Sequence, residues 1–323
     1  MIENQSAILF PELEKIGYKF DNNVLVFSAK SLNKDLAISF PFGVLHYSLP
    51  IDDHSILVVD ESHPESVILY DYLRGSVISS LSLPGPITRF ESSGNFACLI
   101  HSTGLSIISA RPHVLLLSIP LSSAPPAISI VSPISDTNHV FLAYSDEATP
   151  GNLLIQKIPS SVSPISFPAH KKPVVSCSIS NDAKYLVTAS STGTIVRLWT
   201  ITGKKLHESR RGFFSAQIQH LSFSPDSQFF CATSNHFTAH IFRTEKKPTD
   251  DDSYFLTKAE VKVPLETSKT LSAFVLAGGQ HLCLITDKGA CYTYSVNVNT
   301  GESSQKSQIM LPNIARMLIK SNV

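Results

Sequence analysis

The sequence lacks a charge excess of either sign. Its 26 Lys and Arg residues balance 26 Asp and Glu residues, so the formal net charge is zero. A protein that grips nucleic acid along the backbone needs a Lys or Arg for each phosphate that it neutralises. The composition therefore excludes broad nucleic-acid binding and confines any anion site to a local cluster of cations.

Paired cysteines and long uninterrupted apolar runs are missing too. The five cysteines form no CxxC pair and no zinc-like spacing, which predicts a reduced compartment. The N-terminal residues place acids on both sides of a very short apolar run, the wrong order for a secretory signal. The most apolar stretch, His113 to Ile134, is interrupted by four prolines, so it cannot be a membrane-spanning helix. We expect a cytoplasmic protein whose membrane contact is peripheral.

Catalytic signatures are also missing. The sequence contains no G-x-S-x-G, no H-E-x-x-H, no Walker A motif and no G-x-G-x-x-G. His236 and His240 stand four residues apart, but further ligands of the right type are not nearby, so no metal site is expected. The prediction is a binding protein that is not an enzyme and uses no cofactor.

Short apolar or alternating runs bounded by turn residues recur along the chain, whereas helical periodicity is nearly absent. This pattern predicts an all-β protein. So many strands need a closed architecture, because a large open sheet exposes its edges or curls. The clearest runs are Asn23–Ser28, Ser55–Val59, Val67–Tyr70, Ser76–Leu81, Asn95–Ile100, Leu105–Ile108, His139–Ala143, Leu153–Ile158, Val174–Ile179, Tyr185–Ala189, Ile195–Trp199, Ile218–Phe223, Phe229–Ala232, Ala239–Phe242, Glu260–Pro264, Thr270–Val275, Leu282–Thr286 and Ala290–Val296.

An internal repeat decides the fold class. Ser178–Trp199 aligns with Ser222–Phe242 at a period of about 44 residues, each with strand, turn, strand, turn and strand. This period is typical of a WD-type propeller blade, and the length of 323 residues holds about seven blades. Single Trp199 ends a blade strand and is expected in the core. A pair of β-sandwiches is the alternative, but sandwiches do not produce such self-similarity.

The prediction is one seven-bladed β-propeller domain over residues 1–323. Blade 5 is expected at about 170–212, blade 6 at about 213–265, and blade 7 at about 268–300 plus a terminal strand. The first forty residues follow the blade pattern least well.

One local cluster of cations stands out in the neutral chain. Only one acid, Glu208, lies among its members, which are Arg197, Lys204, Lys205, Arg210 and Arg211. Side chains alternate along a strand, so two adjacent arginines on an outer strand are expected to point to opposite faces and to serve two pockets. The alternative is a solvated basic strand without a ligand.

The repeat supplies each arginine with a matching set of polar partners. Ser190, Thr194 and Arg197 in blade 5 align with Ser234, Thr238 and His240 in blade 6, if one extra residue near Ile195–Arg197 forms a bulge. Each set offers two hydroxyls and a cation. Guanidinium binds phosphate bidentately and hydroxyls bond around a sugar-like ring, so the pattern predicts two pockets for a phosphorylated headgroup.

The stretch Ala169–Phe242 strongly resembles the PROPPINs, the WIPI-type phosphoinositide-binding propellers of eukaryotic autophagy, and its Arg-Arg-Gly looks like their Phe/Leu-Arg-Arg-Gly signature. The resemblance implies two rim sites for phosphatidylinositol 3-phosphate or the 3,5-bisphosphate. Carried over by position, the first site would contain His170, Ser190, Thr194, Arg197 and Arg210. The second would contain Arg211, Ser234, Thr238 and His240. Ser209 replaces the usual Phe or Leu and is expected to loosen the arginine strand.

The resemblance also implies a membrane-inserting loop and a protein partner. Here the blade 6 loop from Arg243 to Ala259 is short and carries three aspartates, with Tyr254, Phe255 and Leu256 as the candidate wedge. The alternative is that these three residues begin the final strand of blade 6. A lipid-transfer or scaffold partner is expected near blades 2 and 3, where Asp60–Ser66 would contribute. The chain would act as a monomer on autophagic, endosomal or vacuole-type membranes.

Two rival functions remain open from the sequence. One is a WD-repeat scaffold whose cations read an acidic or phosphorylated peptide without binding lipid. The other is a homologue that kept the fold and lost the sites. A peptide reader needs one pocket, so the doubled set of hydroxyls favours lipid, and the retained Arg210–Arg211 pair argues against loss.

Overall fold

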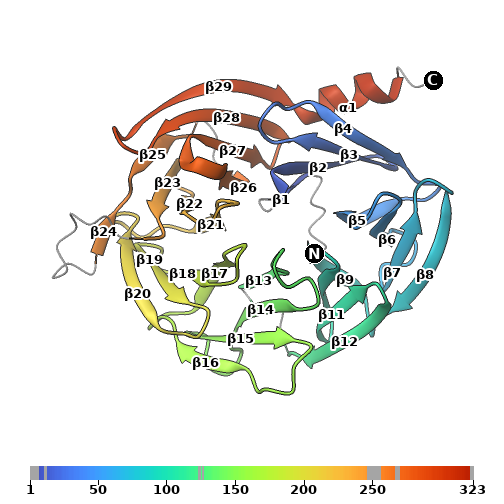
Figure 1. Ribbon diagram of the computed structural model, residues 1–323, viewed down its shortest axis with the longest axis horizontal. Helices are drawn as coiled ribbons and strands as arrows, with labels where there is room; N and C mark the ends of the chain where they lie inside the picture. Colours follow the sequence, from blue (N-terminus) through green and yellow to red (C-terminus); the bar gives the residue numbers. More distant parts are fainter. Residues whose placement is uncertain are drawn as a thin grey trace.

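The computed structural model describes residues 7–10, 13–122, 125, 127–245, 256–265 and 270–320. These residues form seven sheets arranged as a ring around a central axis, and every strand pair but one is antiparallel (Figure 1). The prediction of a single seven-bladed β-propeller is confirmed.

Each blade is built from strands that follow one another in the chain. Blade 1 contains β1 (Ala7–Phe10), β2 (Lys15–Phe20), β3 (Asn23–Ser28) and β4 (Lys34–Ser39). Blade 2 contains β5 (Val44–Pro50), β6 (Ser55–Asp60), β7 (Ser66–Asp71) and β8 (Ser76–Ser82). Blade 3 contains β9 (Ile87–Ser93), β10 (Phe96–His101), β11 (Gly104–Ala110) and β12 (His113–Pro120). Blade 4 contains β13 (Ile128–Val131), β14 (Val140–Ser145), β15 (Asn152–Ile158) and β16 (Ile165–Pro168).

The remaining three blades carry the candidate sites and the end of the ring. Blade 5 contains β17 (Val174–Ile179), β18 (Tyr185–Ser190), β19 (Ile195–Thr200) and β20 (Lys205–Arg210). Blade 6 contains β21 (Ile218–Phe223), β22 (Phe229–Ser234), β23 (Thr238–Arg243) and β25 (Val261–Pro264). Blade 7 contains β26 (Thr270–Val275), β27 (His281–Thr286), β28 (Ala290–Asn297) and β29 (Glu302–Met310), with the short helix η2 (Ala277–Gly279) between β26 and β27.

The core lies between neighbouring blades. The middle strands pack between two neighbouring blades, and their buried positions are mostly apolar, as in Ile56–Val59 of β6. Between blades 5 and 6, Val187 and Leu198 pack with Phe230 and Phe242 in one cluster. The outer strands β8 and β12 face solvent on one side and alternate or carry serines.

Among the residues that the structure describes, blades 1 and 7 exchange no strand, so this part of the ring closes by packing. Phe27 of blade 1 and Phe274 of blade 7 share a buried cluster with Leu311 and Ala315 of α1 (Leu311–Lys320). Figure 1 shows α1 following β29 to the outside of blade 1. Blade 1 forms the same kind of four-stranded antiparallel ladder as the other blades in the residues that the structure describes, although the first forty residues follow the sequence pattern of the blades least well.

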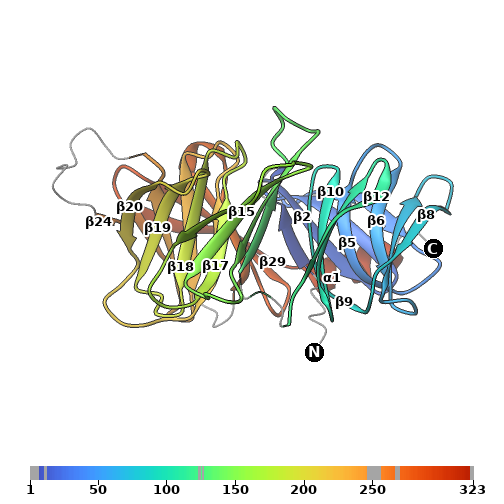
Figure 2. The ribbon, with the colours of Figure 1, turned by 90° about the horizontal axis from the view of Figure 1, so that it is seen from below.

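A further strand, β24 (Leu256–Lys258), extends blade 5 to five strands. It pairs in parallel with β20 across the blade boundary, although it belongs to the connection between β23 and β25 of blade 6 (Figure 2). Leu256 therefore does not begin the final strand of blade 6, which is β25. The outer edge of β20, which a four-stranded blade would leave unpaired, is covered by this pairing.

Candidate functional site

The two repeated turns of blades 5 and 6 lie at the same end of the strands as the Arg-Arg-Gly sequence. Strand β18 ends at Ser190 and β20 at Arg210, and both run antiparallel to β19, so the two ends are on one side. In blade 6 the equivalent turn follows Ser234. Gln217 and Asn235 exchange hydrogen bonds at 3.0 and 3.1 Å, which joins the connection after β20 to this second turn.

The two turns differ in length by one residue. Four residues, 191–194, separate the paired strands of blade 5, whereas three residues, 235–237, do so in blade 6. The extra residue lies in the turn and not in a bulge, because a turn absorbs it without breaking the ladder; the β18–β19 pairing has no register shift. Arg197 opposite Thr188 and His240 opposite Ala232 therefore occupy equivalent positions.

Arg210 is the last residue of β20 and is half-buried. Its guanidinium carbon lies 5.1 Å from the ring centroid of Phe213, a cation–π distance. On its strand it pairs with Ile195 on one side and with Lys258 of β24 on the other. Arg210 thus presents a cation at the rim, beside an exposed aromatic ring.

Arg211 has a different environment, since it is 4% exposed. Its Nε donates to the carbonyl of Gly193 at 2.8 Å, and its Nη2 donates to the carbonyl of Phe214 at 2.6 Å. Burial lowers the pKa of the guanidinium from its ordinary value. The adjacent arginines therefore have separate surroundings, and Arg211 also organises the chain around it.

The turn of blade 5 holds the arginine segment, residues 210–217, through hydrogen bonds between backbone groups. The carbonyl of Thr194 accepts from the amides of Arg211 and Gly212 at 3.0 and 3.3 Å, and that of Thr192 accepts from Ala216 at 3.1 Å. Gly193 has a φ of +65°, and a Cβ there would lie 1.8 Å from the carbonyl oxygen of Ala216. Only glycine fits this approach without a shift of backbone.

Ser209 does not loosen the strand, contrary to expectation. It is 1% exposed and pairs with Val196 on one side and with Thr257 of β24 on the other. Backbone ladders on both edges hold β20, so the loss of an apolar side chain at this position leaves the strand paired.

The other predicted members of site 1 are tied into the blade. Arg197 donates from Nε to Glu208 at 2.8 Å and from Nη1 to the carbonyl of Ala169 at 2.7 Å. Its Nη1 lies 3.4 Å from Nδ1 of His170. Burial, reinforced by the charge of Arg197, lowers the pKa of His170 to about 4, so this histidine is neutral near pH 7.

A hydrogen-bonded chain connects His170 to the core. The Nε2 of His170 lies 2.9 Å from Oγ1 of Thr188, which also accepts from Nε1 of Trp199 at 2.9 Å. Trp199 is 6% exposed and packs against Phe167 with ring centroids 4.8 Å apart, as its expected place in the core requires. His170 and Arg197 are therefore positioned by the fold, whereas the half-buried Arg210 stacks on the exposed ring of Phe213.

Site 2 gathers buried polar groups. The side chains of Ser234 and His240 are buried, and Thr238 donates from Oγ1 to the carbonyl of His236 at 3.0 Å. Burial, followed by the charges of Arg211 and Lys262, lowers the pKa of His240 to about 4. Within the described residues, Nδ1 of His240 is buried without a hydrogen-bond partner. An unpaired buried nitrogen beside two cations is a feature that a ligand could satisfy.

Lys262 is a member of this group that the sequence reasoning missed. It lies on β25 directly opposite His240, and its side chain is exposed. The signal was present in the alternation Val261-Lys262-Val263, where the two valines are buried. Without the register of β23 and β25, the partner of that lysine could not be identified.

The structure describes one of the three residues of the candidate membrane wedge. Tyr254 and Phe255 lie outside the described residues, and Leu256 is the first residue of β24. Leu256 is thus committed to backbone pairing with Glu208.

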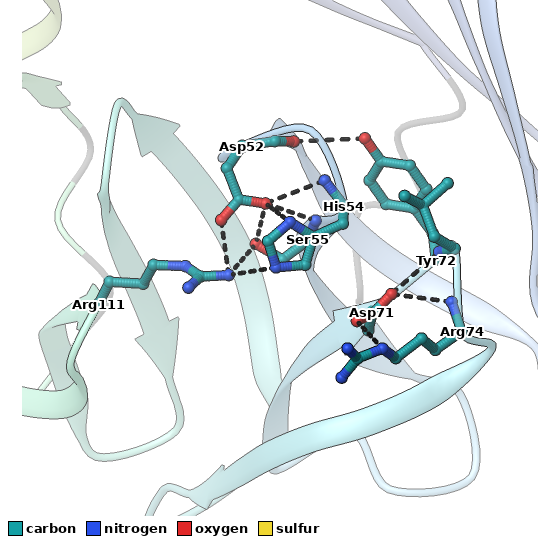
Figure 3. A network of polar contacts seen from close by, with 8 residues as sticks. Asp52, His54, Ser55, Asp71, Tyr72, Arg74 and Arg111 are labelled. Carbon is teal, nitrogen blue, oxygen red and sulfur yellow. Dashed lines mark hydrogen bonds and ion pairs between the residues drawn. The ribbon is translucent and has the colours of Figure 1, made fainter.

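The expected partner surface at blades 2 and 3 has two ordered polar centres at opposite ends of β6. At one end, the carboxylate of Asp60 accepts from the amide and the hydroxyl of Ser62, both at 2.8 Å, within the loop Asp60–Ser66. At the other end, Arg111 from the β11–β12 turn of blade 3 reaches Asp52 and Ser55 of blade 2 (Figure 3). Burial acts to raise the pKa of Asp52, but hydrogen bonds from His54 and Ser55 and the charge of Arg111 outweigh it and lower that pKa.

The described part of the chain contains no helix that is both long and apolar enough to cross a membrane. Nor do those residues bring three or more His, Cys, Asp or Glu side chains into a group that could hold a metal ion.

The chain is similar to known proteins in sequence and in fold. Human WD repeat domain phosphoinositide-interacting protein 1 is 30% identical over 196 residues, 59% of this chain and 43% of that protein. Autophagy-related protein 18 of Vanderwaltozyma polyspora is 41% identical over 88 residues, 26% of this chain and 16% of that protein. The chain thus spans less than half the length of these curated relatives.

The solved structure of Kluyveromyces lactis Hsv2 superposes with a TM-score of 0.80 at 15% identity, over 95% of this chain and 98% of that chain, which shows a shared fold. The family model described as PROPPIN matches residues 49–254, from the end of β5 in blade 2 to the connection between β23 and β25 in blade 6. That range contains both repeated turns and the arginine pair, and the chain therefore belongs to the PROPPIN family.

Proposed function

We propose that this protein binds the headgroup of a 3-phosphorylated phosphoinositide, the 3-phosphate or the 3,5-bisphosphate, through two rim sites on blades 5 and 6. The observation that supports this most is the placement of Arg210 and Arg211 between two equivalent turns, each bordered by a pair of hydroxyl side chains. The name of the human relative includes phosphoinositide interaction, and that of the yeast relative includes autophagy.

The chemistry of each site suits a phosphorylated inositol. In site 1 the half-buried Arg210 supplies a guanidinium that can bind phosphate bidentately. Ser190 and Thr194 belong to the blade 5 turn and its preceding strand, and His170 contacts Arg197. In site 2 Lys262 and Arg211 supply positive charge, and the unpaired Nδ1 of His240 can bond with a ligand hydroxyl or phosphate. Neither site needs a reactive group, so the role that follows is recognition and not catalysis.

Two sites on one rim would also give the protein a higher affinity for the membrane than either site has alone. Once one headgroup is bound, the second site meets its ligand at the high effective concentration of the membrane surface. The protein would then act as a peripheral adaptor in autophagosome formation or endosomal traffic, as a cytoplasmic monomer. The ordered loop Asp60–Ser66 and the Asp52–Arg111 contact on blades 2 and 3 would take the protein partner, of lipid-transfer or scaffold type.

The test is co-flotation of the purified protein with phosphatidylcholine vesicles that carry phosphatidylinositol, its 3-phosphate or its 3,5-bisphosphate. Wild type should float only with the 3-phosphorylated lipids, and Arg210→Thr with Arg211→Thr should abolish flotation. Because Arg211 is buried, the single variant Arg210→Thr is included; it leaves both Arg211 side-chain bonds intact.

The matched control removes two positive charges elsewhere. Lys184→Thr with Lys204→Thr changes exposed lysines at the opposite end of the blade 5 strands and should float like wild type. A folded wild type that ignores all three lipids would overturn the proposal and would favour a scaffold that reads an acidic peptide.

A further inference from the structure

Three phenylalanine side chains are exposed among the described residues. Phe213 is 83% exposed, Phe214 is 80% exposed and Phe237 is 47% exposed, whereas every other described phenylalanine is buried or half-buried. Burial of a phenyl group is favourable, so two adjacent rings left in water are a departure from ordinary surface composition. Such a departure marks a contact surface.

All three rings lie at one end of the strands, in neighbouring blades. Phe213 and Phe214 are in the connection from β20 to β21, and Phe237 is in the turn from β22 to β23. The reciprocal hydrogen bonds of Gln217 and Asn235 join these two segments directly. The phenylalanines therefore form one feature, which borders both candidate headgroup sites.

The segment that carries Phe213 and Phe214 is held rigidly. Four hydrogen bonds tie it to the blade 5 turn: three from the backbone amides of Arg211, Gly212 and Ala216, and one from Nε of Arg211. A fifth, from Nη2 of Arg211 to the carbonyl of Phe214, closes the segment on itself. The rings are thus presented by a braced loop, and little ordering entropy would be lost when they enter an apolar phase.

The charge around the rings selects the kind of surface that they meet. Residues 209–225 contain no Asp or Glu, and Arg210 stacks on the ring of Phe213 at 5.1 Å. An exposed ring in contact with a cation matches the layering of an anionic membrane, where phosphate lies just above hydrocarbon.

We propose that Phe213, Phe214 and Phe237 insert into the interfacial layer of the bilayer while Arg210 and Arg211 meet the headgroups. This inference rests on the proposed function and adds the apolar half of the membrane contact. The insertion point is then the arginine segment and its neighbouring turn.

The first experiment separates insertion from headgroup recognition. Phe213→Ser with Phe214→Ser is compared with wild type on vesicles of phosphatidylcholine with phosphatidylinositol 3-phosphate, and on the monomeric dioctanoyl form of the same lipid. The variant should bind the vesicles about tenfold or more weakly and the soluble lipid within about twofold of wild type, since two phenyl groups lose their burial. Leu73→Ser, which removes an exposed apolar side chain of blade 2, is the control and should match wild type on both probes.

The second experiment detects the ring inside the lipid. Phe214→Trp should gain fluorescence quenching by brominated phosphatidylcholine, whereas Leu73→Trp should not; the native Trp199 is buried and gives the same background in both. Soluble-lipid binding without bromine quenching, or unchanged vesicle affinity in the double serine variant, would overturn the insertion alone and assign the rings to a protein partner. A wild type that binds neither probe would overturn both proposals.

Discussion

Arg197 and Glu208 face each other across the β19–β20 ladder, with Nε of the arginine 2.8 Å from Oε1 of the glutamate. Lys205 approaches the same carboxylate oxygen at 3.3 Å. The carboxylate of Glu208 therefore neutralises part of the positive charge of the cluster of basic residues. Arg210 is left as the cation of site 1 that stacks on an exposed ring.

Removal of this internal carboxylate should strengthen anion binding. In Glu208→Gln the charge of Arg197 is no longer offset, so the affinity of vesicles carrying the 3-phosphate should rise by about threefold, the scale of one partly screened charge pair. The control is Glu260→Gln, which removes a carboxylate 3.7 Å from Arg243, outside both sites. Titration of vesicles by light scattering measures the change, and weaker binding in the first variant would show that the ion pair itself builds the pocket.

Replacement of Gly193 should destabilise the protein, whereas Gly212, at the same contact between the blade 5 turn and the arginine segment, should tolerate a side chain. Gly193→Ala places a Cβ against the carbonyl of Ala216 in a left-handed backbone, so we expect about 2 kcal/mol or more of lost stability and a displaced arginine segment. A Cβ on Gly212 meets nothing within 4 Å, so Gly212→Ala should fold normally. Urea unfolding and co-flotation give both readouts, and equal stability of the two variants would contradict this account of the turn.

Stability should fall as the solution becomes mildly acidic. Burial lowers the pKa of His46, His170, His220 and His240 to about 4, below the value of about 6.5 that unfolded histidine has. The unfolded chain therefore binds protons between pH 6.5 and 4 that the folded chain refuses, so the free energy of unfolding decreases as pH falls through this window.

The size of that effect can be checked with one variant. Each such histidine should cost about 1 kcal/mol between pH 7.5 and 5.5. His46 lies away from both candidate sites, with Nε2 3.3 Å from the carbonyl of Ile87, so His46→Gln should reduce the loss measured by urea unfolding at these two pH values. A wild type equally stable at both would refute the assignment of neutral buried histidines.

The C-terminal helix should stabilise the closed ring. Leu311 is fully buried in the cluster that joins blades 1 and 7, so Leu311→Ala should lower the free energy of unfolding by about 2–4 kcal/mol. Met317, on the same helix, is 64% exposed, and Met317→Ala should change it by less than about 0.5 kcal/mol. Thermal unfolding followed by circular dichroism measures the stability of both variants. Similar melting temperatures of the two variants would show that the helix does not stabilise the closed ring.

The sequence allowed the propeller and the place of the candidate site to be predicted where local signals were strong. The 44-residue repeat lies in blades 5 and 6, and the strand pairs there match the alignment of Ser190 with Ser234 and of Arg197 with His240. Period-two alternation and turn residues are local properties, so they can be read without knowing what packs against them. The same reasoning found blade 7 but underrated blade 1, whose ladder does not need the repeat's sequence pattern.

The structural features that the sequence did not predict depend on contacts between residues that are distant in the chain. Strand β24 exists because Leu256–Lys258 meets an open edge of another blade, and three residues carry no signal of such a pairing. The burial of Arg211 follows from two carbonyls supplied by Gly193 and Phe214. Likewise Lys262 joins site 2 only through the register of β25 with β23.

The closure of the ring by docking has a consequence for how the molecule is made. Each of the seven blades consists of consecutive residues apart from β24, so every blade can assemble from contacts that are local in sequence while the chain is still being synthesised. The exception is the seam between blades 1 and 7, whose partners are separated by most of the chain. Completion of the toroid is then a single late event, in which α1 seals the seam after the last blade has formed.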